Sequence, residues 1–248
     1  MSFHAAFVSD LHLKANDEKN AQIFVRFLRR LHDENHFTHL FLLGDVFDFW
    51  VSDHGYFIEK YSNVVEELDR IVRKGVEVHF FEGNHDLHLE KYWQRKLGIR
   101  VHNEPSYFQL GSKTLRIEHG DLMDPDDKGY AFLKSILNTS TVKYLADNIH
   151  ESLISKVGEL GSRASRHYTS HSKVVSDENK KAKQHSYVLK KFEEKKFDLF
   201  VAGHIHVRID EAIELGDQKI RSLNLGTWLD QPVVLVLSES LCEFQSLL

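Results

Sequence analysis

Five short segments rich in Asp, His and Asn each follow an apolar run of the chain. They are Asp10-Leu11-His12, Gly44-Asp45-Val46-Phe47-Asp48, Gly83-Asn84-His85-Asp86, His119-Gly120-Asp121 and Gly203-His204-Ile205-His206. Carboxylate oxygens and imidazole nitrogens are ligands of hard or borderline divalent cations, and the segments contain no thiolate. Loops at the carboxyl ends of strands in an open α/β sheet converge on one crevice, so distant segments can meet there. We therefore expect one metal centre, suited to Mn, Fe, Zn or Mg.

The spacing within the segments predicts how each would hold an ion. Asp10 and His12 are two residues apart, as are His204 and His206. In extended backbone, alternate side chains point to the same side, so each pair could bind an ion from one side. The glycines at positions 44, 83, 120 and 203 would allow tight turns or a close approach of the backbone to a phosphate.

A phosphoryl-transfer site with two ions needs a carboxylate that can bridge them. Two ions roughly 3.5–4 Å apart can clamp a phosphoryl group and activate water near neutral pH. Asp45 is the candidate bridge, because it lies midway in the series and follows the apolar residues 39–43. Asp86 and Asp121 are predicted to brace the ligand loops by accepting hydrogen bonds from nearby backbone N–H groups.

The order of the apolar patterns predicts an α/β fold. Strand-like runs and helical periods alternate in the first half, as in βαβ units. The expected strands there span residues 3–9, 39–43 and 76–81, and the expected helices span residues 19–35 and 58–73. Shorter runs at residues 99–102, 107–110, 114–118, 209–215, 220–225 and 233–237 predict the strands of a second sheet.

The apolar residues follow a different period between the runs at residues 114–118 and 209–215. Apolar residues recur every three or four positions from Val142 to Leu160, which predicts a helical insertion at 126–196 in a core made of 1–125 and 197–248. The stretch 163–196 has ten Lys or Arg against four Asp or Glu, an excess of six positive charges. The apolar stripe is typical of helix packing, and it could also wall a site for acyl chains.

Composition sets the general class of protein. With 248 residues, 42% hydrophobic and 28% charged, we expect one globular domain with an insertion. The net charge of −5 gives no electrostatic case for a nucleic-acid partner. The single Cys242 forms no intrachain disulfide, residues 1–13 do not resemble a signal peptide, and the apolar run 233–237 is too short to span a bilayer. These features favour a cytoplasmic location.

The five segments, in this order, resemble the motifs of the calcineurin-like metallophosphoesterase family over residues 10–206. The resemblance implies a four-layer α/β/β/α sandwich with a helical cap and two divalent ions, most often Mn. It assigns one ion to Asp10, His12, Asp45 and His206, and the other to Asp45, Asn84, His119 and His204.

One branch of this family is more similar, the UDP-2,3-diacylglucosamine pyrophosphohydrolases of lipid A synthesis. The matching features are residues 44–50, the Asp126-Asp127-Lys128-Gly129-Tyr130 run, and Leu225-Gly226-Thr227-Trp228. The resemblance implies cleavage of UDP-2,3-diacylglucosamine to UMP and lipid X, with Asp127 and Tyr130 as substrate contacts. The best-known members of the branch have Arg where this chain has His85.

His85 changes the expected chemistry, because a His beside the metals can protonate the leaving oxygen, whereas an Arg supplies only charge. Asp48 is placed to orient His85, and Asn84 would help to hold the phosphoryl group. The sequence is therefore compatible with this pyrophosphohydrolase or with a phosphodiesterase or phosphatase on another soluble nucleotide or phosphoester. A non-enzymatic binding module of the same fold should have lost ligands, and here all seven ligand positions are filled.

The basic part of the insertion leaves two interpretations open. His167, His171 and Lys173 could be a solvated surface, or they could capture an anionic substrate. The basic flank could also contact the inner membrane surface peripherally, because each Lys or Arg near an anionic surface adds ~1 kcal/mol. The sequence predicts no oligomeric state.

Overall fold

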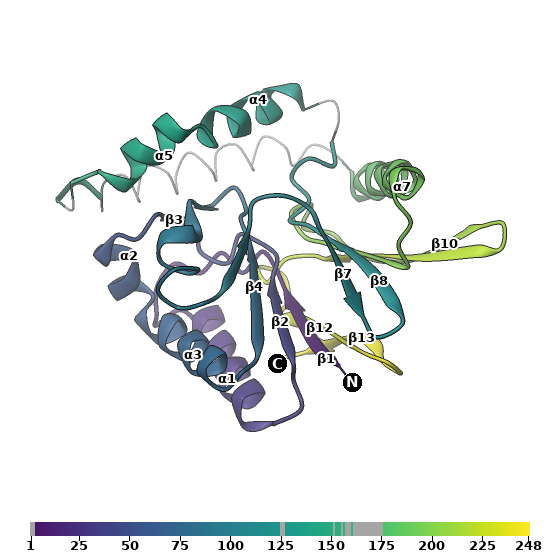
Figure 1. The fold of residues 1–248 in the computed structure, drawn as a ribbon, viewed down its shortest axis with the longest axis horizontal. Coiled ribbons are helices and arrows are strands. Elements are labelled where there is room, and N and C mark those ends of the chain that lie inside the picture. Colours follow the sequence, from purple (N-terminus) through teal and green to yellow (C-terminus); the bar gives the residue numbers. More distant parts are fainter. Residues whose placement is uncertain (1–2, 125–126, 151, 155, 157–159, 161–175) are drawn as a thin grey trace.

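A computed structural model describes residues 3–124, 127–150, 152–154, 156, 160 and 176–248. In these ranges the chain forms two large β-sheets with helices outside them, as Figure 1 shows. The fold class is α/β, as predicted.

The first sheet contains six strands in the order β13-β12-β1-β2-β4-β6. Its strands are β1 (His4–Val8), β2 (His39–Leu42), β4 (Glu77–Phe81), β6 (Arg100–His102), β12 (Val233–Ser238) and β13 (Cys242–Ser246). Neighbours among β1, β2, β4 and β6 are parallel, whereas β12 and β13 are added in antiparallel pairings. The prediction that residues 99–102 and 233–237 belong to a second sheet is wrong, because these runs pair with β4 and β1.

The second sheet contains five strands in the order β10-β11-β9-β8-β7. Its strands are β7 (Ser106–Leu110), β8 (Lys113–Ile117), β9 (Leu199–Ala202), β10 (Arg208–Leu215) and β11 (Gln218–Leu225). The parallel strands β8, β9 and β11 form its centre. A small parallel pair, β3 (Trp50–Val51) and β5 (Asp86–Leu87), lies apart from both large sheets.

Helices cover the outer face of the first sheet. Helix α1 (Lys19–Asp33) and helix α3 (Ser62–Arg73) bury their apolar stripes there, in one cluster with Val8, Leu42 and Phe80. The predicted helix at 58–73 is two helices, α2 (Gly55–Lys60) and α3. The chain leaves helical geometry at Tyr61, whose fully buried ring packs 4.5 Å from the ring of Phe47.

The two sheets pack face to face through a second apolar cluster. The rings of Phe7 and Phe41 stack at 4.6 Å, and Leu115, Val201 and Leu223 face them from the second sheet. On the far side of the second sheet, helix α7 (Asp177–Glu194) packs its residues Val188 and Phe192 on Phe200, Ile213 and Ile220. The layers therefore follow the predicted α/β/β/α order.

Helices α4 (Lys128–Leu137) and α5 (Ser140–Asp147) lie beyond the carboxyl ends of β2 and β4, as Figure 1 shows. The Ala146 carbonyl of α5 lies 2.8 Å from Nε2 of His54, and Lys143 pairs with Glu90 of the short 3-10 helix η1 (Leu89–Lys91) at 2.6 Å. The division at 126–196 stays a prediction, and α7, which falls within it, packs on the second sheet. No helix among the described residues is long and apolar enough to cross a membrane.

Candidate metal centre

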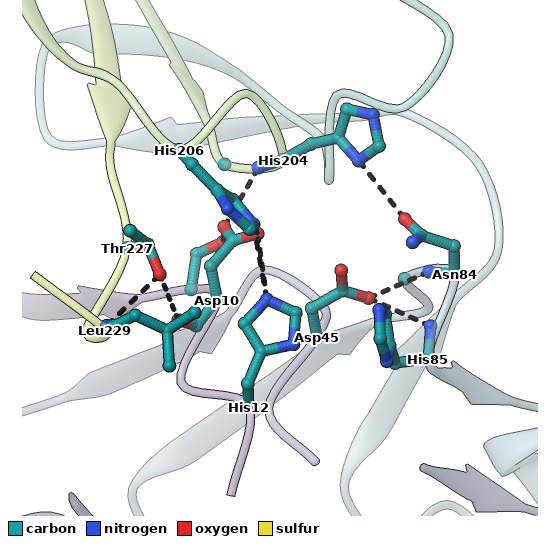
Figure 2. A network of polar contacts seen from close by, with 12 residues as sticks. Asp10, His12, Asp45, Asn84, His85, His204, His206, Thr227 and Leu229 are labelled. Atoms are coloured by element: carbon teal, nitrogen blue, oxygen red, sulfur yellow. Dashed lines mark hydrogen bonds and ion pairs between the residues drawn. The ribbon is translucent and has the colours of Figure 1, made fainter. Parts of the chain in front are cut away.

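All seven predicted metal ligands meet at the carboxyl ends of five strands. Asp10 and His12 follow β1, whereas the other ligands follow β2, β4, β8 and β9. Figure 2 shows these side chains around one space between the loops, and it labels Asp10, His12, Asp45, Asn84, His204 and His206. Three groups of three side chains have ligand atoms that all lie within 4.8 Å of one another. Convergence of strand ends therefore produces the site that the motif order predicts.

The first group consists of Asp10, His12 and His206. Nε2 of His206 lies 3.2 Å from Nε2 of His12 and 3.1 Å from Oδ1 of Asp10. Ligands held about 2.0–2.2 Å from one ion stand about 3–3.5 Å apart, so these spacings are those of donors around a cation.

The second group consists of Asp45, His119 and His204, with Asn84 beside it. Nδ1 of His204 lies 3.2 Å from Nε2 of His119, and Oδ1 of Asn84 lies 3.1 Å from both nitrogens. Oδ2 of Asp45 is 3.7 Å from Nε2 of His119. The four donors supply mixed nitrogen and oxygen ligation.

Asp45 connects the two groups. It also forms a third group with His12 and His85, so its carboxylate is within reach of donors from both of the other groups. Its Oδ1 accepts hydrogen bonds from the backbone N–H of Asn84 and His85, at 2.9 and 3.0 Å. These bonds fix the carboxylate between the loops, where a bridging ligand would have to stand.

A buried atom without a partner tests whether the donors suit a cation. Oδ1 of Asp10 is buried and makes no hydrogen bond to any described residue, although Nε2 of His206 is only 3.1 Å away. An isolated buried carboxylate oxygen is unfavourable unless a charge compensates it. A divalent ion between Asp10, His12 and His206 would supply that charge, so these residues fit the ion.

The tautomer of His119 and the pKa values of His12, His204 and Asp45 agree with this assignment. The pKa values of His119 and His206 are raised instead, because burial lowers them but nearby carboxylates together raise them more. Nδ1 of His119 lies 2.7 Å from the Leu43 carbonyl and donates to it, which leaves Nε2 free to ligate. Burial lowers the pKa of His12 and of His204 to about 4, so both rings are neutral near pH 7. Burial alone would raise the pKa of Asp45, but the imidazoles around it, His85 and His119 foremost, hold it well below its usual range. Metal ligands need these deprotonated forms.

Five of the predicted ligands have left-handed backbone. The φ angles are 54° at Asp10, 49° at His12, 52° at Asp45, 70° at His204 and 58° at His206. The expectation that the two spaced pairs sit on extended backbone is therefore wrong. Such angles are uncommon for residues with a Cβ and persist where the surrounding structure enforces them, as at functional sites.

Close packing at the glycines helps to enforce this backbone. Gly44 has a φ of 83°, and a Cβ there would lie 2.5 Å from Nδ1 of His119. At Gly203 a Cβ would overlap the side chains of Ser9 and Asp10. The glycines of the motifs thus allow ligand loops to contact one another.

Asp86 braces two ligand loops. Its fully buried carboxylate accepts hydrogen bonds from the backbone N–H of Gly83, Asp45 and Val46, at 2.9, 3.0 and 2.8 Å. Asp121, predicted for a similar role, instead accepts from the Tyr130 hydroxyl at 2.5 Å and pairs with Lys134 of α4 at 2.6 Å. It therefore connects the loop after β8 to helix α4.

His85 lies inside the cluster and is 2% exposed. Its Nδ1 is 2.8 Å from the backbone carbonyl oxygen of Asp48, and its ring centroid is 4.7 Å from that of His12. A carbonyl can only accept, so Nδ1 carries the proton of this hydrogen bond. The hydrogen bond from Nδ1 of His85 is therefore made to the main chain of Asp48.

The predicted substrate contacts are placed in part. Asp127 caps the start of α4, where its side chain accepts from the Tyr130 N–H at 2.8 Å. The ring centroid of Tyr130 lies 6.2 Å from that of His204, which puts the residue beside the metal centre. His167, His171 and Lys173 lie outside the described residues.

Several supporting residues escaped prediction from sequence. Thr227 accepts from the Leu229 N–H at 3.2 Å and donates its hydroxyl to the Asp10 carbonyl at 3.1 Å, as Figure 2 shows. Its position in the Leu225-Gly226-Thr227-Trp228 motif was the available signal. Lys180 of α7 donates to the carbonyl between His204 and His206, and nothing in the Lys-rich helix sequence separated it from its neighbours.

Comparison with known proteins places the chain in a family. A model of the calcineurin-like phosphoesterase family matches residues 3–208. The chain belongs to this family and is a metallophosphoesterase-type hydrolase. The family implies divalent metal ions, and the donor groups described above could hold them.

Curated relatives match over most of their length. A UDP-2,3-diacylglucosamine hydrolase from Photorhabdus laumondii is 26% identical over 226 residues, which cover 91% of each chain. Another from Serratia proteamaculans is 28% identical over 231 residues, which cover 90% of each chain. The solved structure of a dimetal phosphatase from Danio rerio covers 99% of this chain and 96% of its own, with a TM-score of 0.48 and 13% identity.

Proposed function

We propose that this hydrolase cleaves the pyrophosphate of UDP-2,3-diacylglucosamine to UMP and lipid X, using two divalent ions, with Mn as the first candidate. The donor cluster is the observation that carries the proposal. Asp45 belongs both to the group with His12 and His85 and to the group with His119 and His204. The names of the two relatives, and matches that cover 91% and 90% of each chain, support the choice of substrate.

Ions bound in this cluster would polarise the phosphoryl oxygens and lower the pKa of water, so that hydrolysis proceeds near neutral pH. Asp10, His12, Asp45 and His206 would hold one ion, and Asp45, Asn84, His119 and His204 the other. Asn84 would also orient the phosphoryl group through its amide, whose Oδ1 lies 3.1 Å from Nε2 of His119 and from Nδ1 of His204.

His85 is the proposed proton donor to the leaving oxygen. Its Nδ1 proton is engaged by the Asp48 carbonyl at 2.8 Å, so the proton delivered to the substrate must come from Nε2. Asp48 would keep the ring in this orientation.

The helices over the site support a substrate with acyl chains. Large apolar side chains on and near α4 and α5 are between 41% and 68% exposed, namely Phe132, Leu133, Ile136, Tyr144, Leu145, Leu153 and Leu160. Such an exposed apolar group fits a lipid-binding or membrane-facing surface. We propose that this helical cap, predicted to span 126–196, receives the acyl chains, that Asp127, Tyr130, His167, His171 and Lys173 contact the polar part of the substrate, and that the cytoplasmic protein associates peripherally with the membrane.

An assay of UMP release tests the metal centre and the substrate together. With Mn²⁺ present, the wild-type protein should release UMP from UDP-2,3-diacylglucosamine, and Asp45→Ala should remove nearly all metal-dependent turnover. Full activity of Asp45→Ala would refute the bridging role. Turnover of bis-p-nitrophenyl phosphate without UMP release would keep the metal centre and reject the substrate.

Matched surface substitutions test the cap. The double variant Phe132→Ser/Leu145→Ser should lose turnover of the acylated substrate and keep that of the small diester. Leu248→Ser, at the chain end and 72% exposed, is the control that should change neither. Equal loss of both activities in the cap variant would remove the acyl-binding role.

A second candidate function is hydrolysis of another nucleotide or phosphoester, favoured by His85. An imidazole can protonate an alkoxide leaving group, whereas a phosphate leaving group needs less assistance. His85→Arg should therefore reduce cleavage of alkyl phosphodiesters more than cleavage of the pyrophosphate. Equal effects on both substrates would remove the argument for this candidate.

A further inference from the structure

One face of helix α7 contacts the loop that carries two of the predicted ligands. Lys180 and Gln184 are four residues apart, so they lie on the same side of the helix. The Lys180 ammonium donates a hydrogen bond of 3.1 Å to the carbonyl oxygen of Ile205, the residue between His204 and His206. Helix α7 thus reaches the metal centre although it contains no predicted ligand.

Gln184 reaches the same loop through Asn224. The Asn224 amide donates to Oε1 of Gln184 at 3.0 Å and to the Gly203 carbonyl at 2.7 Å. The Gln184 amide donates to the Ser222 hydroxyl at 3.0 Å. All three polar side chains are at most 1% exposed, so their bonds are shielded from competing water.

These contacts act on the peptide units that determine the backbone at the ligands. The Ile205 carbonyl shares a peptide plane with the nitrogen of His206, whose φ is 58°, and the Gly203 carbonyl shares one with the nitrogen of His204, whose φ is 70°. On the opposite side, the His204 N–H donates to Oδ2 of Asp10 at 2.9 Å. Rotation of either plane would break its bond and redirect the imidazole that follows.

We propose that Lys180 and Gln184 are positioning residues of the metal centre, through which α7 keeps the His204 and His206 imidazoles directed at their ions. The proposal rests on the metal centre of the proposed function. Lys180 would act mainly on the group of Asp10, His12 and His206, and Gln184 on the group containing His204.

The direction in which loss of the Lys180 ammonium changes the metal affinity distinguishes a positioning role from a purely electrostatic one. The positive charge of Lys180 lies beside the loop of His204 and His206, because its ammonium is 3.1 Å from the Ile205 carbonyl oxygen. Removal of a positive charge near a cation site should by itself strengthen cation binding. Loss of the fixed peptide plane should weaken it, and substitutions in the supporting shell of a metal site typically weaken binding 10–100-fold.

The test measures Mn²⁺ binding to the full chain by calorimetry and by electron paramagnetic resonance. The resonance spectrum distinguishes paired from single Mn²⁺. Lys180→Met should bind one of the two ions about 10–100-fold more weakly, with the signal of single Mn²⁺, and Lys180→Arg should restore much of the affinity. Lys181→Met, an exposed neighbour with the same charge change, is the control and should bind like the wild type. Gln184→Met should weaken binding at least tenfold.

Thermal unfolding of the metal-free variants distinguishes positioning from loss of the fold. Unchanged unfolding of Lys180→Met together with weaker binding supports the proposal. Wild-type affinity in Lys180→Met, or an equal loss in Lys181→Met, would overturn it for Lys180, and unchanged affinity in Gln184→Met would overturn it for Gln184. If the wild-type chain itself binds no pair of Mn²⁺ ions, the metal centre of the proposed function fails first.

Discussion

Replacement of Asp86 tests whether one carboxylate holds two ligand loops together. In Asp86→Ala, the backbone N–H groups of Gly83, Asp45 and Val46 lose acceptors at 2.9, 3.0 and 2.8 Å. These groups come from the loops after β4 and β2, which carry Asn84 and Asp45. The variant therefore removes the cross-link between these loops without replacing any predicted ligand.

The expected magnitude follows from these three bonds and the energy of burying a charge. A hydrogen bond to a charged group contributes about 1.5–3 kcal/mol to stability. Burial and repulsion from Asp45 offset part of this, because together they raise the pKa of Asp86 to about 6. We expect Asp86→Ala to lower the free energy of unfolding by about 3–5 kcal/mol, less than the simple sum. Asp86→Asn can keep the two bonds of Oδ1 and lose that of Oδ2, so it should lose only about 1–2 kcal/mol.

Urea unfolding of the metal-free protein at neutral pH measures these differences, with Asp230→Ala, an exposed Asp, as the control. Mn²⁺ affinity should fall in the same order, with Asp86→Ala most affected. If Asp86→Ala lowers the free energy of unfolding by less than about 1 kcal/mol, which is below the contribution of one hydrogen bond to a charged group, Asp86 does not brace the loops. A loss in Asp86→Asn as large as in Asp86→Ala would show that charge, and not the bond pattern, holds the loops.

Three further predictions follow from the same structure. Burial lowers the pKa of His79 to about 3, so its folded form binds fewer protons than the unfolded chain, in which His titrates near 6.5. Stability should be full above about pH 6.5 and fall by about 2 kcal/mol by pH 5, and His79→Phe should flatten that decline in urea unfolding. Removal of metal by a chelator should lower the midpoint of thermal unfolding, and Mn²⁺ should restore it, because ions that bind only the folded state stabilise it; an unchanged midpoint would contradict the site. Gly44→Ala should lose about 2–4 kcal/mol of stability from left-handed strain and the clash with His119, whereas Gly75→Ala, with a φ of 94° and open space, should lose about 1 kcal/mol in the same measurement.

The sequence predicted that the candidate ligands would meet at one place, and the structure brings them together. Their chemical types and their positions after apolar runs are local features, and strand ends of an α/β sheet converge whatever the details of the loops. Asp10, Asp45 and His204 therefore meet in the structure although they are far apart along the chain. Their assignment to particular ions stays a prediction.

The strand partners and the backbone at the ligands could not be predicted in this way. Residues 99–102 and 233–237 carry the same apolar pattern as strands of the second sheet, yet they pair with β4 and β1. A short apolar run specifies that it will be buried, and not which neighbour will bury it. The left-handed φ of His206 likewise occurs beside a carbonyl that accepts a hydrogen bond from Lys180, which is distant in the sequence.

By itself, then, the sequence determined the α/β class and the types of donor side chain, because these follow from side-chain chemistry and local periodicity, whereas the layer order was implied by the resemblance of its motifs to a family. Only the tertiary structure decided how the donors are held. Lys180 and Asn224 donate hydrogen bonds to the backbone carbonyls of Ile205 and Gly203. A backbone group looks the same in every residue, so no side-chain pattern marks where such a bond will form.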